Sequence, residues 1–313
     1  MSRAAAAGAL DVVGVGYAGL DHLTLVPSFP IPGQKTRMER LFDGGGGQTA
    51  TALVTLARLG RRTAAVCAVG DDDVGRAVLD GLRSEGVDVT HAVVRRGVES
   101  QFSWVLVDAR DGERTVVCRR VPALDLGSGD AEALAPLERA RCLVLDLHEE
   151  LGLDAARRAR ARGIPAILGA ERVRPFTDEL LSLCDVVICG GGFLAESTGE
   201  AAVDDQLSTV AARGPEVVVA TRGAHGAVAL VRGERVEQPG FAVDVVDTTG
   251  AGDVFHGAFA HAYLDGRPIP ECLDLASATA AMSCRDLGGR AALPADEAEV
   301  RAWMATNPAG RPR

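Results

Sequence analysis

Lysine is almost absent from this sequence, in which Lys35 is the only one. A phosphate-binding loop of the G-x-x-x-x-G-K-[ST] type needs a lysine after its glycines, and a protein kinase needs one in a Val-Ala-Ile-Lys strand. Lys35 follows Gln34 and satisfies neither pattern. The sequence therefore excludes both classes, and it excludes any Schiff-base enzyme whose lysine is not Lys35.

Basic charge, paired cysteines and long apolar runs are also scarce. Lys plus Arg number 33 against 43 Asp plus Glu, a net charge of -10 that argues against a nucleic-acid partner. The 7 cysteines show no C-x-x-C spacing, and no stretch approaches the roughly 18 apolar residues of a membrane span. The alanine-rich start is cut by Asp11 before it reaches signal-peptide length. We expect a reduced, cytoplasmic protein with no membrane partner.

Apolar residues make up 47% of the chain, enough for a large core. Short apolar runs alternate with helical patterns, which is typical of parallel strands joined by crossover helices. The alternation predicts one α/β domain over 1–313, with a mostly parallel sheet flanked by helices. The expected strands are 12–16, 20–26, 63–69, 142–147, 164–168, 186–189 and 217–220, followed by a hairpin around Gly233. The expected helices are 49–60, 71–82, 154–162, 178–183, 251–264, 269–284 and 295–304.

Two segments, 20–42 and 92–120, break this alternation. The first is rich in proline, and the second has an Asp111-Gly112 turn and three short extended runs, 92–94, 103–107 and 114–118. We expect both to form a small β-sheet lid over the substrate. Alternating apolar residues would leave the lid with an apolar face and open edges, which predicts a homodimer paired through the lid. These residues are Val93, Phe102, Trp104 and Val117.

The most informative segment is Asp247-Thr-Thr-Gly-Ala-Gly-Asp253, which opens a predicted helix. Gly250, Ala251 and Gly252 have little or no side chain, so their backbone N–H groups can converge on an anion at the helix N-terminus. Asp253 lies among these groups. We expect its carboxylate to stay ionised near neutrality and to take a proton from a hydroxyl that attacks a phosphoryl group. A helix cap without chemical function is the alternative interpretation.

This segment resembles the signature of the ribokinase (PfkB) family of sugar kinases. The family's paired glycines before a helix ending Ala-Arg-Leu-Gly correspond to Gly46-Gly47 and to 57–60. The resemblance implies a ribokinase-like, doubly wound fold and an ATP-dependent sugar kinase. It makes Asp253 the catalytic base and the backbone of 250–252 the anion hole. A monovalent-cation site for K⁺ is implied beside Asp247 and Thr249.

The resemblance also assigns the sugar and nucleotide contacts. Asp21 follows the first strand, as the family's sugar-contacting aspartate does, and its two oxygens can accept from neighbouring hydroxyls. A turn residue is the alternative for Asp21. Thr221-Arg-Gly-Ala-His-Gly226 resembles the loop that meets the ATP phosphates, with a plain hairpin turn as the alternative. The resulting sugar set is Asp21, Gly46, Gly47 and Thr51, and the nucleotide set is Thr221, Gly223 and Gly226.

Three positions depart from the family pattern. Gly190 and Phe193 stand where the family often has an Asn-x-x-Glu motif that organises Mg²⁺ around the phosphates. Thr51 stands where an asparagine is common. We therefore expect transfer to require Mg²⁺ held mainly by ATP, and a sugar pocket that differs from that of ribokinase itself.

Within the family, 69–73, 241–258 and 288–291 are most similar to 6-deoxy-6-sulfofructose kinases, which phosphorylate a ketose carrying a sulfonate. Lys35 lies where that subgroup has a sulfonate-contacting lysine. The asparagine and arginine that partner it there are replaced, near Cys118 and His148. Arg119 and Arg120 are substitutes, since a guanidinium suits a sulfonate, or they are a solvated pair on a lid strand.

The expected acceptor is therefore a ketohexose phosphorylated at a primary hydroxyl. 6-Deoxy-6-sulfofructose is the first candidate, and an unmodified sugar, as used by a fructokinase or a ribokinase, is the second. Gly14-x-Gly16-x-x-Gly19 mimics a dinucleotide fingerprint, but only 7 residues separate Gly19 from Pro27, so the required helix cannot form. A non-catalytic sugar-binding regulator on the same scaffold would not need Asp253.

Overall fold

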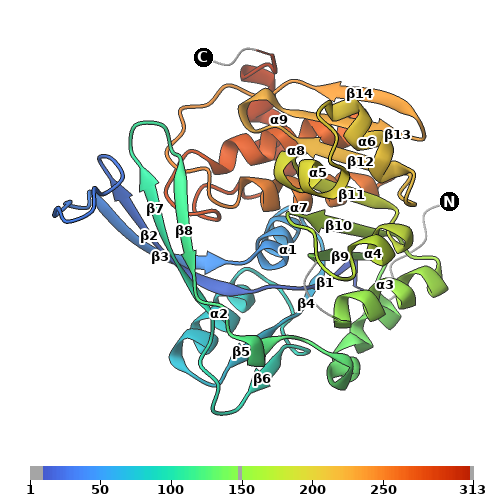
Figure 1. Ribbon diagram of the computed structural model, residues 1–313, viewed down its shortest axis with the longest axis horizontal. Coiled ribbons are helices and arrows are strands. Elements are labelled where there is room, and N and C mark those ends of the chain that lie inside the picture. The colour runs from blue at the N-terminus through green and yellow to red at the C-terminus, as the bar shows by residue number, and fades with distance from the viewer. Residues whose placement is uncertain (1–9, 147–149, 311–313) are drawn as a thin grey trace.

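An eight-stranded sheet forms the centre of the computed structural model, which describes residues 10–146 and 150–310 (Figure 1). Its strand order is β14-β13-β12-β11-β10-β9-β1-β4. The strands from β12 to β4 in this order are parallel, and β13 and β14 add an antiparallel edge. The bounds are β1 Val12–Val15, β4 Thr63–Val66, β9 Cys142–Asp146, β10 Ala166–Ala170, β11 Val186–Gly190, β12 Val217–Thr221, β13 Ala227–Val231 and β14 Glu234–Gln238.

Helices cover both faces of this sheet, as the alternation predicted. Successive strand residues point to opposite faces, so Val12 and Val13 are both fully buried but belong to different core clusters. One face packs on α1 Gln48–Arg58, α2 Asp73–Ser84, α7 Ala251–Leu264, α8 Ile269–Ser283 and α9 Glu297–Thr306. The other packs on α3 Glu150–Arg162, α4 Thr177–Leu183, α5 Gly191–Thr198 and α6 Val203–Ala211.

A second sheet of order β3-β2-β7-β8 projects from the body (Figure 1). Its strands are β2 Gly19–Val26, β3 Arg40–Gly46, β7 Phe102–Asp108 and β8 Arg114–Cys118. Leu23, Leu25, Val105 and Val107 form its buried face with Leu287 of the body. We call this four-stranded sheet the lid.

One predicted lid strand lies elsewhere. β6 Val93–Arg95 pairs with β5 Ala68–Gly70 in a separate two-stranded sheet, so the expectation that 92–94 belongs to the lid is wrong. The side chain of Asp72, which caps α2, also accepts hydrogen bonds from the backbone N–H and the hydroxyl of Ser100. These bonds hold the 93–100 segment beside α2 and away from the lid.

The remaining boundaries follow the sequence pattern closely. α7 has the predicted bounds, whereas the predicted strand 63–69 is divided at Cys67 into β4 and β5. α5 and α6 were not predicted. After β1 the chain enters β2 and not a helix, which confirms that the dinucleotide fingerprint is a false match. Among the described residues, no helix combines the length and apolar composition that crossing a bilayer requires.

Candidate active site

The turn before α7 is fixed by Asp247, whose side chain is almost fully buried. Its Oδ1 accepts the N–H of Thr249 at 2.8 Å, and its Oδ2 accepts the N–H of Gly288 at 2.8 Å. Gly250 has a φ of 73°, a left-handed conformation that favours glycine. A Cβ added at Gly250 would lie 3.1 Å from Cα of Gly289. Asp247 therefore joins two glycine-containing turns into one unit.

The first N–H groups of α7 have no acceptor within the helix, as at any helix N-terminus. A Cβ added at Gly252 would meet nothing within 4 Å, so this residue faces open space. The N–H of Ala251, by contrast, donates to the carbonyl of Thr248 at 3.3 Å. Of the three predicted anion-hole residues, Ala251 thus has its N–H directed into the turn.

Asp253 lines a cleft at this end of α7. Burial raises the pKa of its carboxyl well above the usual range, and the nearby charges of Glu171 and Asp146 raise it further. Arg114 and Arg290 lower the same pKa. The expectation that Asp253 stays ionised near neutrality considered only the N–H groups, and it included neither burial nor the charges of the two carboxylates.

These two carboxylates come from the carboxyl ends of neighbouring parallel strands, where ligands of such sheets usually bind. Asp146 ends β9 and Glu171 follows β10, and both line the cleft. Oδ2 of Asp146 accepts the N–H of Tyr17 at 2.8 Å, whereas its buried Oδ1 has no partner in the described part of the chain. Gly190 also lines the cleft, but Phe193 is fully buried in the core. The signal that would have identified Asp146 and Glu171 is their position near the carboxyl ends of predicted strands, within 142–147 for Asp146 and just after 164–168 for Glu171.

The predicted nucleotide residues line the same cleft, whose volume is about 610 Å³. Thr221 ends β12, and its hydroxyl donates to the carbonyl of Cys189 at 3.3 Å. Gly223 and Gly226 have φ values of 55° and 81°. A Cβ at Gly226 would lie 2.1 Å from the carbonyl oxygen of Gln238, so only glycine lets this loop pass β14. The volume falls within the range of small-molecule sites.

Three predicted sugar residues meet where the lid joins the body. Asp21 is on β2, and a Cβ added at Gly46 would lie 2.2 Å from its Oδ2. Gly47, with a φ of 93°, caps α1 next to them. Burial raises the pKa of Asp21, and a hydrogen bond from Ser103 opposes the shift. The fourth predicted residue, Thr51, is buried on α1.

Arg290 completes this region and was not predicted as a site residue. Its Nε donates to Oγ1 of Thr51 at 3.1 Å, and its Nη2 donates to the carbonyl of Gly46 at 2.9 Å. Burial lowers its pKa to about 10, while the charges of Asp21 and Asp253 favour its protonated form. The sequence contained Arg290 in the 288–291 motif, but no pattern there indicated that it reaches Thr51.

The three cations predicted to bind a sulfonate, Lys35, Arg119 and Arg120, do not line the cleft. Lys35 is exposed in the loop between β2 and β3. Arg119 pairs with Glu99, and Arg120 pairs with Asp125 at 2.7 Å. Both arginines are exposed and already hold carboxylates. Cys118 is exposed at the end of β8, and His148 lies outside the described residues.

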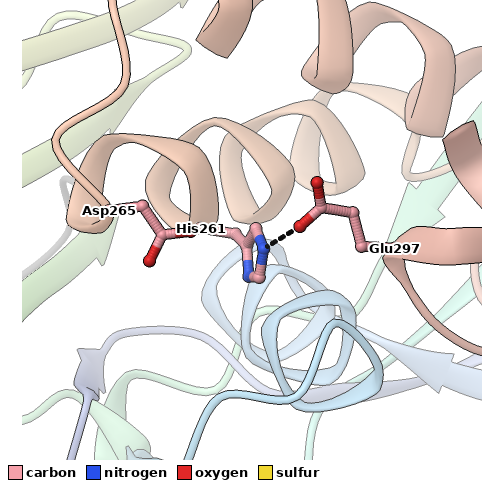
Figure 2. A group of neighbouring side chains, drawn as sticks. All are labelled: His261, Asp265 and Glu297. Atoms are coloured by element: carbon pink, nitrogen blue, oxygen red, sulfur yellow. Dashed lines mark hydrogen bonds and ion pairs between the residues drawn. The ribbon is translucent and has the colours of Figure 1, made fainter.

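A separate group, His261, Asp265 and Glu297, has the composition of a metal site (Figure 2). Its ligand-type atoms lie within 4.8 Å of one another. However, Arg61 donates to Nδ1 of His261 at 3.0 Å and to Asp265 at 2.6 Å, and Arg267 donates to Glu297 at 2.7 Å. Because guanidinium groups occupy these ligand atoms, we interpret the group as an ion-pair network that joins α7 to α9.

The chain is similar to known proteins over most of its length. The model of the pfkB family of carbohydrate kinases matches residues 9–296. A ribokinase from Mus musculus is 30% identical over 299 residues, covering 91% of this chain and 92% of its own. A nucleoside kinase from Methanothermobacter thermautotrophicus is 24% identical over 313 residues, covering 94% and 96%. The structure of Arabidopsis thaliana ribokinase complexed with ribose and ATP has a TM-score of 0.79 at 24% identity, covering 95% of this chain and 99% of that one. At that identity the likeness concerns the fold.

Proposed function

The chain belongs to the pfkB family of carbohydrate kinases, and we propose that it transfers the γ-phosphoryl group of ATP to a primary hydroxyl of a ketohexose. One observation carries the proposal: a single cleft joins the Thr221–Gly226 loop to Asp253. Asp21 is close enough to the same centre that its charge acts on Arg290 together with that of Asp253. These observations support a site in which donor, base and acceptor contacts lie around the N-terminus of α7.

In the proposed reaction, Asp253 takes the proton of the sugar hydroxyl while that oxygen attacks the γ-phosphorus. The new P–O bond forms as the bond to ADP breaks, and ADP leaves with the electron pair. A raised pKa suits this role, because a base is most effective when its pKa approaches the working pH. The N–H groups at the start of α7 stabilise the negative charge on the transferred group.

Magnesium fits the proposed site. Its chemistry there is to neutralise clustered phosphate charge. Oδ1 of Asp146 is a buried oxygen with no partner in the described part of the chain, and Glu171 lines the same cleft. These two carboxylates are the side chains that would hold the ion or its water ligands. With Gly190 and Phe193 lacking ligand atoms in their side chains, we propose that ATP supplies most of the coordination.

A monovalent cation such as K⁺ fits beside the anion hole. Oγ1 of Thr249 is buried and has no partner within 10–146 and 150–310. Each oxygen of Asp247 accepts one backbone N–H, and an ionised carboxylate can accept further contacts. Asp247 and Thr249 are the residues we propose to hold the cation.

The charge of the acceptor separates two candidate substrates. We place an uncharged ketohexose such as fructose first, because Arg119 and Arg120 are each engaged by a carboxylate. 6-Deoxy-6-sulfofructose is the second candidate. It is favoured by Lys35, for which the described residues offer no ion-pair partner within 4.0 Å. Of the three cations predicted to bind a sulfonate, Lys35 is the one with no carboxylate partner among the described residues.

Oligomeric state is a further part of the proposal. The outer face of the lid exposes 48% of Trp104, 58% of Leu41 and 60% of Val117. A surface of this kind usually marks an interface, so we propose a homodimer that pairs through the lid.

The test mixes the protein with ATP, Mg²⁺ and one sugar at a time, and measures ADP. The sugars are fructose, 6-deoxy-6-sulfofructose, ribose and adenosine. We expect ADP formation with a ketohexose, and no stimulation by any acceptor would support the non-catalytic regulator. Lys35→Ala distinguishes the two ketohexoses. If Lys35 binds the sulfonate, the variant should raise the KM at least about tenfold for the sulfonated sugar alone. Equal effects on both sugars would exclude that reading.

A further inference from the structure

Arg290 is placed by contacts from two distant parts of the chain. Oγ1 of Thr51, on α1, and the carbonyl of Gly46, at the end of β3, each accept one of its hydrogen bonds. A Cβ added at Gly45 would lie 2.2 Å from its Nη1. The guanidinium therefore occupies space that only a glycine at position 45 leaves open, which fixes its orientation beside the paired glycines.

Two bonds do not use all the donors of this side chain. An arginine has five N–H donors, and it accepts no hydrogen bonds. The bonds to Thr51 and Gly46 use one hydrogen of Nε and one of Nη2. The two hydrogens of Nη1 and one hydrogen of Nη2 have no acceptor among the described residues. A part-buried guanidinium with free donors binds water or an oxygen of a ligand, and its place beside Asp21 and the paired glycines makes the proposed sugar that ligand.

The surrounding charges locate that ligand. The carboxylates of Asp21 and Asp253 both stabilise the cation electrostatically, and its charge in turn lowers the pKa of each. Arg290 thus lies within electrostatic range of the proposed sugar-binding aspartate and of the proposed base. A sugar substrate that contacts both carboxylates therefore lies next to the guanidinium of Arg290.

We propose that Arg290 is a specificity-determining residue that donates hydrogen bonds to a sugar oxygen other than the one phosphorylated. This inference rests on the proposed function. Thr51 is almost fully buried and its hydroxyl accepts from Nε, so Arg290 is the residue that extends N–H donors from this position toward the sugar. The oxygen it contacts lies between the hydroxyl bound by Asp21 and the hydroxyl that meets Asp253.

The competing explanation is a structural one, in which Arg290 only joins the 288–291 turn to α1 and β3. If Arg290 has only this structural role, its loss should raise the KM for ATP and for the sugar alike, because the same turn is bonded to Asp247 and the start of α7. If Arg290 contacts the sugar, its loss should raise the KM for the sugar alone. The two explanations therefore differ in which KM changes.

The experiment compares Arg290→Gln and Arg290→Lys with Arg285→Gln, a control that removes the same charge from an exposed position just after α8. We expect Arg290→Gln to lower kcat/KM for the sugar by about 10- to 100-fold, the loss expected for a hydrogen bond to a charged group. The KM for ATP should change by less than about threefold, and Arg285→Gln should resemble the wild type. Arg290→Lys should recover part of the loss.

Monodeoxy sugars identify the contact directly. The wild type should lose at least about tenfold in kcat/KM when one particular hydroxyl is missing, whereas Arg290→Gln should lose less than about twofold for that same sugar. Gly45→Ala is a second variant, since its Cβ would displace Nη1 without removing the charge. It should show the same selective sugar defect if Arg290→Gln fails to fold.

Two results would overturn the inference. One is a parallel rise in the KM for ATP and for the sugar. The other is an unchanged monodeoxy pattern in Arg290→Gln or Gly45→Ala. Absence of sugar-dependent ADP formation in the wild type would instead contradict the proposed function, so the two failures are distinguishable.

Discussion

Replacing Asp253 with asparagine should separate catalysis from stability. The side chain keeps its shape but cannot take a proton, so kcat should fall by about 10²–10⁴, the usual contribution of a general base. The thermal stability of the protein should increase. A carboxyl whose pKa is raised on folding is destabilising when ionised, and that cost is present once the pH exceeds the raised pKa. Asp253→Asn removes the charge and should therefore raise Tm under those conditions.

Asp265→Asn is the matched control at the other end of α7. Asp265 pairs with Arg61 at 2.6 Å and with Arg267 at 2.9 Å, and these partners lower its pKa, so its loss should reduce Tm while leaving kcat unchanged. The assays are initial rates of ADP formation, ATP affinity by calorimetry, and thermal unfolding. ATP should bind Asp253→Asn at least as tightly as the wild type, because a negative charge near the phosphates is gone. Near-wild-type turnover in Asp253→Asn would refute its role as the base.

Three further predictions concern the cleft and the lid. Gly252→Val places a side chain in the open space at the N-terminus of α7, so it should weaken ATP binding by at least about tenfold in calorimetry while the protein still folds. An unchanged affinity for ATP would mean that the phosphate lies elsewhere. Glu171→Gln removes a negative charge that raises the pKa of Asp253, so the acid limb of the kcat/KM profile should move to lower pH, and a shift to higher pH would contradict the assignment. Trp104→Glu introduces charge on the exposed lid face and should convert a dimer to a monomer by light scattering, whereas a wild-type monomer at micromolar concentration would exclude the lid interface.

The fold was predictable because its strongest signals are local. Apolar runs of strand length alternate with helical patterns, and the glycine turn before Ala251 fixed the start of α7 at the correct residue. The assignment of 92–94 to the lid failed because strand pairing depends on partners distant in sequence. Nothing within that run showed that Asp72 and Ser100 would hold it beside α2.

The candidate site was predictable only in part, for a related reason. Some site residues lie in motifs whose residue types alone indicate the chemistry, namely Asp253, Asp21 and the glycine turns. Arg290 acquires its significance from a bond to Thr51, 239 positions earlier in the chain. The raised pKa of Asp253 likewise depends on burial and on the charge of Glu171, which only the sheet brings near. Contacts of this kind are properties of the folded chain.

The most direct test of the central claim is the stoichiometry of the products, measured over time by ³¹P NMR. The protein is incubated with ATP, Mg²⁺ and fructose, or 6-deoxy-6-sulfofructose in a parallel sample. The account predicts that a phosphomonoester of one of these sugars appears at the same rate as ADP, and that neither forms when the sugar is omitted. ADP with inorganic phosphate in place of the sugar phosphate, or no reaction with either sugar, would contradict a ketohexose kinase.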